Sequence, residues 1–316
     1  MSELLTAYGL FLVELATLAV ILAVVVLLIL SSRRGGHAEG LSVEHLNRRY
    51  EDAADAVKRA IAGKSSFKKQ AKARQKERKR AAKERANQET ARPRLFVIDF
   101  KGDLRASAGA SLREEVSAIL GVASDQDQVL VRLENPGGTV HEHGFAASQL
   151  MRIKRRGLRL LIAIDKVAAS GGYLMACVGD HLLAAPFAIV GSIGVVAQLP
   201  NFHRLLEEHG VDFEMLTAGR YKRTLSLFGK NTDEGRDKLQ QEIDEIHELF
   251  KNQIREHRPQ VDLDQVATGE HWYGVRALEL KLVDELRTSD DFLLEAAKER
   301  DVYAVSYKRR RSFPER

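Results

Sequence analysis

A strand followed by a tight turn of small residues is the feature that most constrains the fold of this chain. The apolar run 160–164 is typical of a buried β-strand, and an apolar, helix-compatible run follows at 173–178. Between them the chain reads Ala-Ala-Ser-Gly-Gly, so Ser170 comes directly before the predicted helix. A hydroxyl in this place lies near unpaired backbone N–H groups, which stabilise negative charge. The pattern fits either the nucleophile of an acyl-transfer enzyme or a serine that only caps a helix.

A second glycine-rich turn follows another predicted strand. Residues 129–133 are rich in β-formers, and Asn-Pro-Gly-Gly at 135–138 leads into a helix-like segment at about 142–154. Glycine lets the backbone adopt angles that expose N–H groups, so this turn is either a plain loop or a source of one oxyanion donor. The Gly171 N–H would be the other donor. If both strands belong to one parallel sheet, the two turns lie at the same carboxyl edge.

Four glycine-containing motifs occur in an order typical of a known family. They are Asn-Pro-Gly-Gly at 135–138, Ala-Ala-Ser-Gly-Gly-Tyr at 168–173, Gly-Ser-Ile-Gly-Val at 191–195 and Gly-Arg-Tyr-Lys-Arg at 219–223. From about residue 94 to the mid-280s the chain resembles the signal peptide peptidase A family. The resemblance implies an α/β fold of the ClpP/crotonase type, which is a spiral of ββα units. It also implies a homo-oligomeric ring or dome with inward-facing sites.

The same resemblance implies a serine–lysine dyad, with Ser170 as the nucleophile and Lys222 as the general base. A serine nucleophile needs a base within hydrogen-bond reach. No histidine after Ser170 stands in a glycine-rich, catalytic-looking context, whereas Lys222 follows Gly-Arg-Tyr. Arg220 and Arg223 flank this lysine, and neighbouring cations favour the unprotonated form of a lysine. Without the resemblance, a run of this kind is usually a solvated basic loop.

The expected reaction is hydrolysis of a peptide bond through an acyl-enzyme. Lys222 takes the proton of Ser170, and the N–H groups of Gly171 and of Gly137 or Gly138 bind the oxyanion. The resemblance implies peptides or unfolded proteins as substrates, including remnant signal peptides, with an apolar or small residue before the scissile bond. Two other classes stay open: a crotonase-like acyl-CoA enzyme, which also uses paired N–H groups, and a non-catalytic membrane scaffold.

Cysteine usage and motif content argue against a cofactor. The single cysteine, Cys177, excludes an internal disulfide and a cysteine-rich metal cluster. It lies in the apolar helix predicted after Ser170, so we expect it to be a small buried hydrophobe. The sequence has no zinc-ligand spacing, no Walker loop and no dinucleotide fingerprint. We therefore expect neither a metal nor a cofactor.

Residues 7–30 predict one transmembrane anchor. Glu14 is the only charge in this stretch, which exceeds the roughly 20 apolar residues that span a bilayer. No Lys or Arg precedes it, and Arg33 and Arg34 follow it, a pattern typical of an uncleaved anchor rather than a cleaved signal peptide. The chain is thus expected to be a single-pass protein of the bacterial inner (plasma) membrane. The basic flank favours a cytoplasmic catalytic domain, whereas the family's role in the envelope favours the periplasm.

Four regions are expected along the chain: the anchor at 7–30, a basic and largely helical linker at 31–93, a serine peptidase domain at 94–300 and a basic tail at 301–316. The second half of the linker is densely basic. A solvated helical spacer is its plain interpretation, and contact with anionic lipid headgroups is a sharper one. Nucleic-acid binding is not expected there, because Phe67 is its only aromatic residue.

Strands and helices are predicted to alternate through the peptidase domain, as in a crossover α/β fold. Residues 95–100 predict the first strand and 111–120 a helix. The apolar run at 182–199 contains two glycines and a serine, so we interpret it as buried strands and not as a second membrane span. Residues 232–258 predict a long amphipathic helix whose apolar positions pack on the core or on another subunit.

Overall fold

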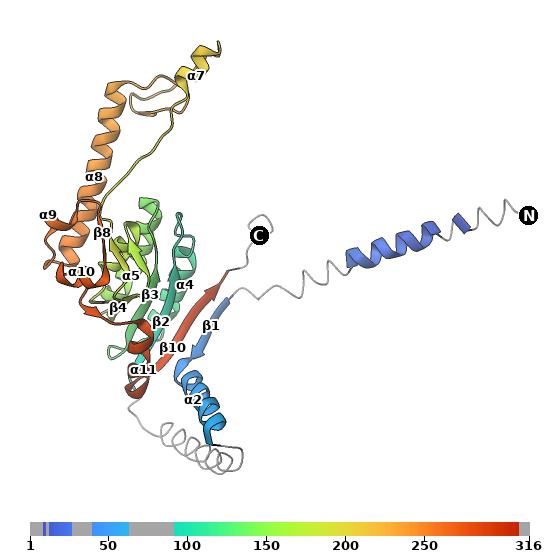
Figure 1. Cartoon of the computed structure of the whole chain (residues 1–316), viewed down its shortest axis with the longest axis vertical. Helices are drawn as coiled ribbons and strands as arrows, with labels where there is room; N and C mark the ends of the chain where they lie inside the picture. The colour runs from blue at the N-terminus through green and yellow to red at the C-terminus, as the bar shows by residue number, and fades with distance from the viewer. Residues whose placement is uncertain (1–8, 11–12, 27–39, 63–91, 310–316) are drawn as a thin grey trace, which may run out of the picture. The chain divides into compact units, whose positions relative to one another are not determined.

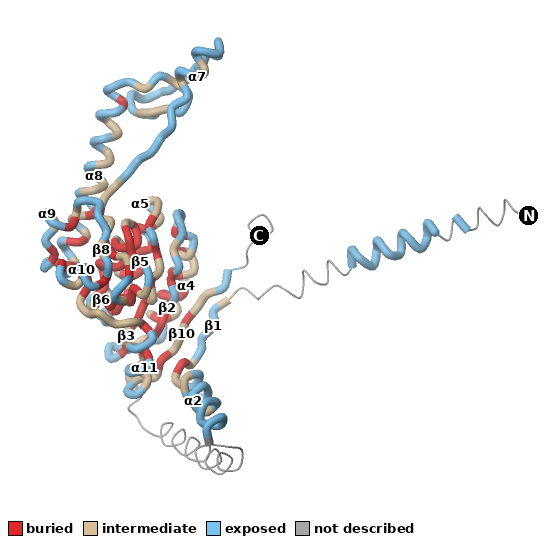
Figure 2. Tube along the Cα trace, viewed as in Figure 1, coloured by how far each residue is buried: buried red, intermediate tan, exposed pale blue. Residues whose placement is uncertain are grey.

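The computed structural model describes residues 9–10, 13–26, 40–62 and 92–309. The chain divides into two compact units, and Ser42–Ser306 forms the larger one. Most buried residues belong to this unit, as the red tube in Figure 2 shows. The unit has the mixed α/β architecture that the sequence predicts.

A seven-stranded sheet runs through the larger unit in the order β1-β10-β2-β3-β4-β6-β9 (Figure 1). The pairings of β10 with β2, β2 with β3, β3 with β4, β4 with β6 and β6 with β9 are all parallel. The strands are β1 (Gly40–His45), β2 (Arg94–Lys101), β3 (Gln128–Glu134), β4 (Arg159–Ile164), β6 (His181–Ala184), β9 (Glu285–Leu286) and β10 (Asp301–Lys308).

Both faces of this sheet are covered, which explains why its central strands are apolar throughout. In β2, Phe96 and Ile98 belong to the larger core cluster, whereas Leu95 and Val97 belong to a second cluster on the other face. Residues of α4 (Gly109–Leu120) and α5 (Val140–Arg155) contribute to the larger cluster, and residues of α2 (Leu46–Ala62) and α11 (Ser289–Glu299) to the second.

A small second sheet contains the strand that leads to Ser170. Its order is β5 (Val167–Ala169), β7 (Ile189–Gly191) and β8 (His271–Tyr273), with β5 parallel and β8 antiparallel to β7. The chain thus passes from β4 in the large sheet to β5 in the small one and then into α6 (Gly171–Ala176), which is a ββα succession. The predicted direct link from the strand at 160–164 to Ser170 is wrong, because the three-residue strand β5 lies between them.

A long helix, α8 (Asp233–His257), confirms the helix predicted at 232–258, and the Thr232 side chain caps it by accepting from the Gly235 N–H. Phe250 and Ile254, in its C-terminal half, are buried in the core. We define the arm as residues 196–232, which contain α7 (His203–Glu208) and precede α8. None of the arm's residues is buried, and Figure 1 shows its α7 part, in yellow, projecting beyond the sheet. Short helices α9 (Leu263–Val266) and α10 (Gly274–Glu279) follow.

The structure corrects the predicted tail and the predicted spacer. Residues 301–308 form β10, which pairs with β2 and buries Val302, so the strand is part of the sheet and not of a tail. Residues 40–62, assigned to the linker, form β1 and α2 of the domain. Local patterns could not show this, because both strands gain their partners from distant parts of the chain. The basic run at 68–85 and the end of the chain from 310 lie outside the described residues.

The predicted anchor at 7–30 lies only partly within the described residues, where 9–10 and 13–26 are helical. No helix in the described ranges combines the length and the apolarity that crossing a membrane requires.

The Asn47 side chain joins α2 to the rest of the domain by hydrogen bonds. The variant Asn47→Ala tests how much these bonds stabilise the fold. Asn47 Nδ2 donates to the carbonyls of Ala297 and Arg300, both at 2.8 Å, and its Oδ1 accepts from the Val302 N–H at 2.7 Å. Removing the amide leaves part-buried backbone groups unpaired, so we expect a loss of about 1–3 kcal/mol in the free energy of unfolding. Denaturant unfolding of the detergent-solubilised full chain measures this, and faster proteolysis within 40–62 should accompany it.

The matched control is Arg48→Ala. Arg48 is 79% exposed and pairs with Asp52 at 4.0 Å, so its loss should change the free energy of unfolding by no more than about 0.5 kcal/mol. Equal unfolding curves for Asn47→Ala and wild type would show that the α2 contact does not stabilise the domain.

Candidate active site

Ser170 has a strained backbone between β5 and α6. Its φ of 52° and ψ of −121° lie in a region that residues other than glycine rarely adopt. Its N–H donates to the Gly191 carbonyl at 2.8 Å, which helps to hold this conformation. Its side chain makes no capping hydrogen bond to α6, so a capping role does not account for the serine. Strain of this kind is typical of residues held for function.

The glycine turn at 135–138 packs directly against Ser170. A Cβ on Gly137, whose φ is 96°, would lie 2.7 Å from the Ala169 carbonyl oxygen and 2.8 Å from the Ser170 Cβ. A Cβ on Gly138 would lie 2.1 Å from the Leu104 carbonyl oxygen. Only glycine fits at these two positions. The structure therefore brings together Gly137, Gly138 and Ser170, as the sequence analysis expected.

Two backbone N–H groups beside Ser170 are available to a ligand. The Gly137 N–H donates to Asn135 Oδ1 at 2.9 Å. In contrast, the N–H groups of Gly138 and Gly171 have no hydrogen-bond acceptor within the part of the chain that the structure describes. Both glycines line the same cavity as Ser170. An oxygen bound there could accept two hydrogen bonds.

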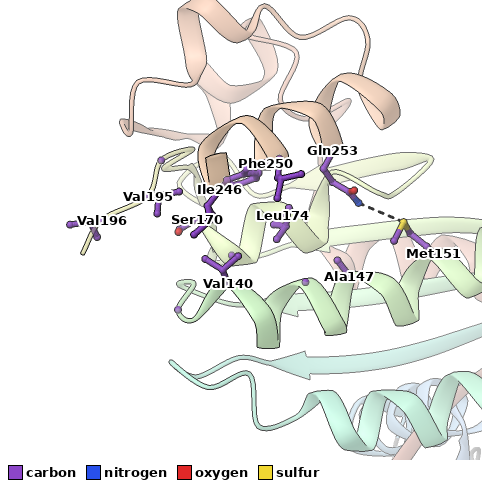
Figure 3. Close-up of a pocket in the computed structure, with 15 residues that line it drawn as sticks. Val140, Ala147, Met151, Ser170, Leu174, Val195, Val196, Ile246, Phe250 and Gln253 are labelled. Atoms are coloured by element: carbon purple, nitrogen blue, oxygen red, sulfur yellow. Dashed lines mark hydrogen bonds between the residues drawn. The ribbon is translucent and has the colours of Figure 1, made fainter. Parts of the chain in front are cut away.

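The cavity beside Ser170 has a volume of about 340 Å³ and a largely apolar lining. Val140 and Ala147 of α5 and Leu174 of α6 form one side, and Ile246 and Phe250 of α8 form the other (Figure 3). Gln253, which donates to Met151 Sδ at 3.6 Å, lies at the end away from Ser170. The cavity is suited to an apolar side chain that extends from a backbone held at Ser170.

An ion pair of the buried Arg258 with the half-buried Asp284 fixes α8, and with it one side of the cavity. Arg258, directly after α8, is only 3% exposed and donates to both carboxylate oxygens of Asp284 at 2.7 Å. Burial by itself would raise the pKa of Asp284, but hydrogen bonds from Arg258 and the Leu182 N–H hold that pKa below its ordinary value. Breaking such a pair leaves a buried charge uncompensated. The C-terminal half of α8 is thus held firmly against the core.

Lys222 is not among the residues that line the Ser170 cavity. It lies on the arm, is exposed to solvent, and its backbone N–H donates to the Gly219 carbonyl at 3.1 Å. Its neighbour Arg220 pairs with Glu234 at 2.7 Å. Within one chain, the structure brings Ser170, Gly137, Gly138 and Gly171 together and leaves Lys222 apart from them.

His143, a buried polar residue behind the glycine turn, was not predicted from the sequence, because only histidines after Ser170 were considered as bases. Asn135 was identified only as part of the glycine motif. His143 is fully buried, with Nδ1 2.9 Å from the Thr139 carbonyl oxygen and Nε2 3.2 Å from Asn135 Oδ1. The available signal was a histidine on the apolar face of α5, in line with Ala146, Ala147 and Leu150. Such a position usually indicates a core residue, so the sequence alone gave it no role.

Cys177, at the end of α6, is fully buried, as expected. Burial raises the pKa of its thiol to about 12, so the sulfur stays protonated and is a poor nucleophile. Within the described residues, no group of three or more His, Cys, Asp or Glu side chains is placed to hold a metal ion.

Comparison with known proteins confirms the resemblance seen in the sequence. The family models described as Peptidase family S49 N-terminal and Peptidase family S49 match residues 3–150 and 152–303. The probable protease SohB of Haemophilus influenzae is 45% identical over 322 residues, which cover 99% of this chain and 91% of that protein. The probable protease SohB of Buchnera aphidicola subsp. Acyrthosiphon pisum is 53% identical over 223 residues, or 71% of this chain and 66% of that protein.

Solved structures are more distant. A membrane-bound stomatin-specific protease, 1510-N, in complex with a substrate peptide has a TM-score of 0.42 and 12% identity, covering 72% of this chain and 96% of that one. The ClpP protease catalytic domain from Plasmodium falciparum has a TM-score of 0.40 and 8% identity, covering 61% of this chain and 85% of that one. The assignment depends on the sequence relatives and the two family models, and these show that the chain belongs to peptidase family S49 and is a serine peptidase.

Proposed function

We propose that the chain is a membrane-anchored endopeptidase that cleaves small or unfolded peptides, remnant signal peptides among them, through an acyl-enzyme on Ser170. The observation that carries this proposal is the strained Ser170 beside two unpaired N–H groups at the end of an apolar cavity. The family assignment favours this peptidase over the acyl-CoA enzyme and the non-catalytic scaffold that the sequence left open.

In the proposed reaction, Lys222 accepts the proton of Ser170 while Oγ attacks the peptide carbonyl. The carbonyl oxygen becomes an oxyanion, which accepts hydrogen bonds from Gly171 and Gly138. We choose Gly138 over Gly137 because the Gly137 N–H already donates to Asn135. The C–N bond then breaks, and Lys222 returns the proton to the leaving amine. A water molecule, deprotonated by Lys222, then attacks the ester carbonyl. The C–Oγ bond breaks, Ser170 Oγ takes the proton back from Lys222, and the second product leaves as an acid.

The cavity supports a preference for an apolar residue before the scissile bond. When the substrate carbonyl lies at Ser170, the neighbouring side chain can enter the space between α5 and α8. Val140, Leu174 and Phe250 would surround it there, and burying an apolar side chain is worth roughly 1.5–3 kcal/mol.

The exposed arm supports assembly into a homo-oligomer, which the resemblance implies as a ring or dome. Its apolar side chains include Leu216, 96% exposed, and Val196, 78% exposed. The others with a large exposed fraction are Leu199, Phe202, Leu205, Val211, Phe213, Met215, Tyr221, Leu227 and Phe228. Apolar side chains exposed in such number are typical of a surface that a partner covers. We propose that neighbouring copies cover the arm and that this assembly brings Lys222 to a Ser170.

The lipid bilayer is the other proposed partner. Residues 7–30 would cross the membrane, and 31–39 would join this anchor to β1, the first strand of the domain. The proposed place is the bacterial inner membrane, and the basic flank of the anchor favours the cytoplasmic side for the domain.

The nucleophile is tested by Ser170→Ala. We expect peptide turnover to fall by at least about 10⁴-fold, because the covalent route is lost. The free energy of unfolding should change by no more than about 0.5 kcal/mol, since the hydroxyl makes no capping bond. The assay is cleavage of a fluorogenic peptide library by the detergent-solubilised full chain, with the exposed-site variant Ser117→Ala as the matched control. Wild-type turnover in a clean Ser170→Ala preparation would rule out this mechanism.

The base is tested by comparing Lys222→Arg with Lys222→Ala. Arginine keeps the positive charge but does not release its proton, so both variants should be about equally inactive. The matched control is Lys230→Arg, at another exposed position of the arm, which should keep full activity. Substantial turnover by Lys222→Arg would show that the residue supplies charge rather than accepting a proton.

The anchor is tested by removing residues 1–35. The shortened chain should leave the membrane fraction, whereas 1 M salt (about 3 Å screening length) should not extract the full chain, because salt screens charges but does not weaken an apolar span. Fractionation followed by immunoblotting measures both. Extraction of the full chain by salt alone would show that electrostatic attraction, and not residues 7–30, holds the protein at the membrane.

A further inference from the structure

The geometry points to Asn135 and His143 as positioning residues for the oxyanion-binding turn. We propose that this buried pair fixes the backbone at Gly137 and so holds the Gly138 N–H towards the carbonyl oxygen that Ser170 attacks. The inference rests on the proposed function of Ser170 and adds to it a role for two side chains that do not touch the substrate.

Asn135 is tied by its backbone to the strand that delivers the nucleophile. Its N–H donates to the Val167 carbonyl at 2.8 Å, and its carbonyl accepts from the Ala169 N–H at 3.1 Å. These two hydrogen bonds form a parallel bridge to β5 one residue past the end of β3. Because Ala169 directly precedes Ser170, the starting point of the glycine turn is fixed relative to the nucleophile.

The Asn135 side chain orients the backbone of the turn at Gly137. Its Oδ1 accepts from the Gly137 N–H at 2.9 Å, which also fixes the orientation of the amide, and Nδ2 donates to Met175 Sδ at 3.2 Å. The hydrogen bond to Oδ1 fixes the orientation of the Gly137 N–H. The next peptide group, which contains the Gly138 N–H, then has less freedom to rotate. Asn135 is fully buried, so water does not compete for these hydrogen bonds.

His143 holds the Asn135 amide from the other side. Its Nδ1 lies 2.9 Å from the Thr139 carbonyl oxygen and its Nε2 lies 3.2 Å from Asn135 Oδ1. Both oxygens only accept, so a neutral ring donates to one of them and packs against the other, whereas a ring with both N–H groups donates to both. The same ring packs under the second oxyanion donor, because a Cβ on Gly171 would lie 2.5 Å from His143 Cγ. The His143 ring thus contacts both Asn135, which orients the turn before Gly138, and Gly171, the other proposed donor.

The surroundings leave this pair little room to move. A Cβ on Gly102 would lie 2.3 Å from Asn135 Cγ, and one on Gly172 would lie 2.1 Å from the Asn135 carbonyl oxygen. Neither Asn135 nor His143 is among the residues that line the cavity. Their loss should therefore disturb the transition state and leave peptide binding in the cavity unchanged.

The test compares His143→Phe and Asn135→Leu with His143→Gln, whose side-chain amide carries an N–H that can donate to Asn135 Oδ1. The matched control is His181→Phe, at a histidine that bonds Glu285 on β9 and does not contact the turn. Each full-length protein is assayed for kcat and KM on one fluorogenic peptide. Each is also assayed for inhibition by a peptide aldehyde, which forms a hemiacetal with Ser170, and for binding of the matching peptide alcohol.

For His143→Phe and Asn135→Leu we expect kcat to fall about 10²-fold, the scale of one lost or misplaced oxyanion donor. Aldehyde inhibition should weaken by a similar factor, because the hemiacetal oxygen occupies the oxyanion position, while KM and alcohol binding stay within about twofold. His143→Gln should recover much of the kcat. The turnover that remains in Ser170→Ala is the background, and it is subtracted from every variant. If wild type itself shows no turnover above this background, the proposed peptidase function is refuted, and not the positioning role alone.

Two results would overturn the positioning role. One is unchanged kcat and aldehyde inhibition in both His143→Phe and Asn135→Leu. The other is a parallel loss of kcat, of alcohol binding and of folding by circular dichroism in both variants, without recovery in His143→Gln. That second result would show that the pair only stabilises the fold.

Discussion

The bridge between Asn135 and β5 is the contact on which the rest of the site depends. Two hydrogen bonds, to the Val167 carbonyl and from the Ala169 N–H, join the end of the large sheet to the small one. The glycine turn starts on one side of this bridge and Ser170 on the other. Because backbone hydrogen bonds in a buried region are costly to break, Ser170 and the turn are placed together before any substrate binds.

Only glycine allows the turn at 137–138 to approach Ser170 so closely. Because glycine-rich turns can be recognised in a sequence, much of the site could be predicted. Side chains at 137, 138 and 171 would collide with Ser170, Leu104 or His143, so the chain needs glycine at each of these positions. Such requirements leave a local trace in the sequence. The apolar strands predicted at 95–100, 129–133 and 160–164 and the long helix α8 leave similar traces, and the structure confirms them. The expectation of buried strands throughout 182–199 was wrong, because only β6 and β7 form there and Val196 and Leu199 are exposed.

What escaped prediction depends on contacts between distant residues. Asn47 and Val302 are 255 positions apart, yet their hydrogen bond joins α2 to β10, and no local pattern distinguishes this from a spacer and a tail. The three residues of β5 are too few to show a period. His143 has the sequence context of a core position, and the role that we propose for it rests on the contacts of its ring with Asn135 and Gly171.

The proposed role of Lys222 as the base would link catalysis to the proposed assembly through one physical requirement. A general base must be unprotonated to act, and removal of water favours the unprotonated form of a lysine. Lys222 lies exposed on an arm whose apolar side chains are also exposed. Covering that arm with a neighbouring copy would bury the apolar surface and remove water from the lysine in the same step. A chain of this kind would gain its base only when assembled, which would restrict proteolysis to the oligomer.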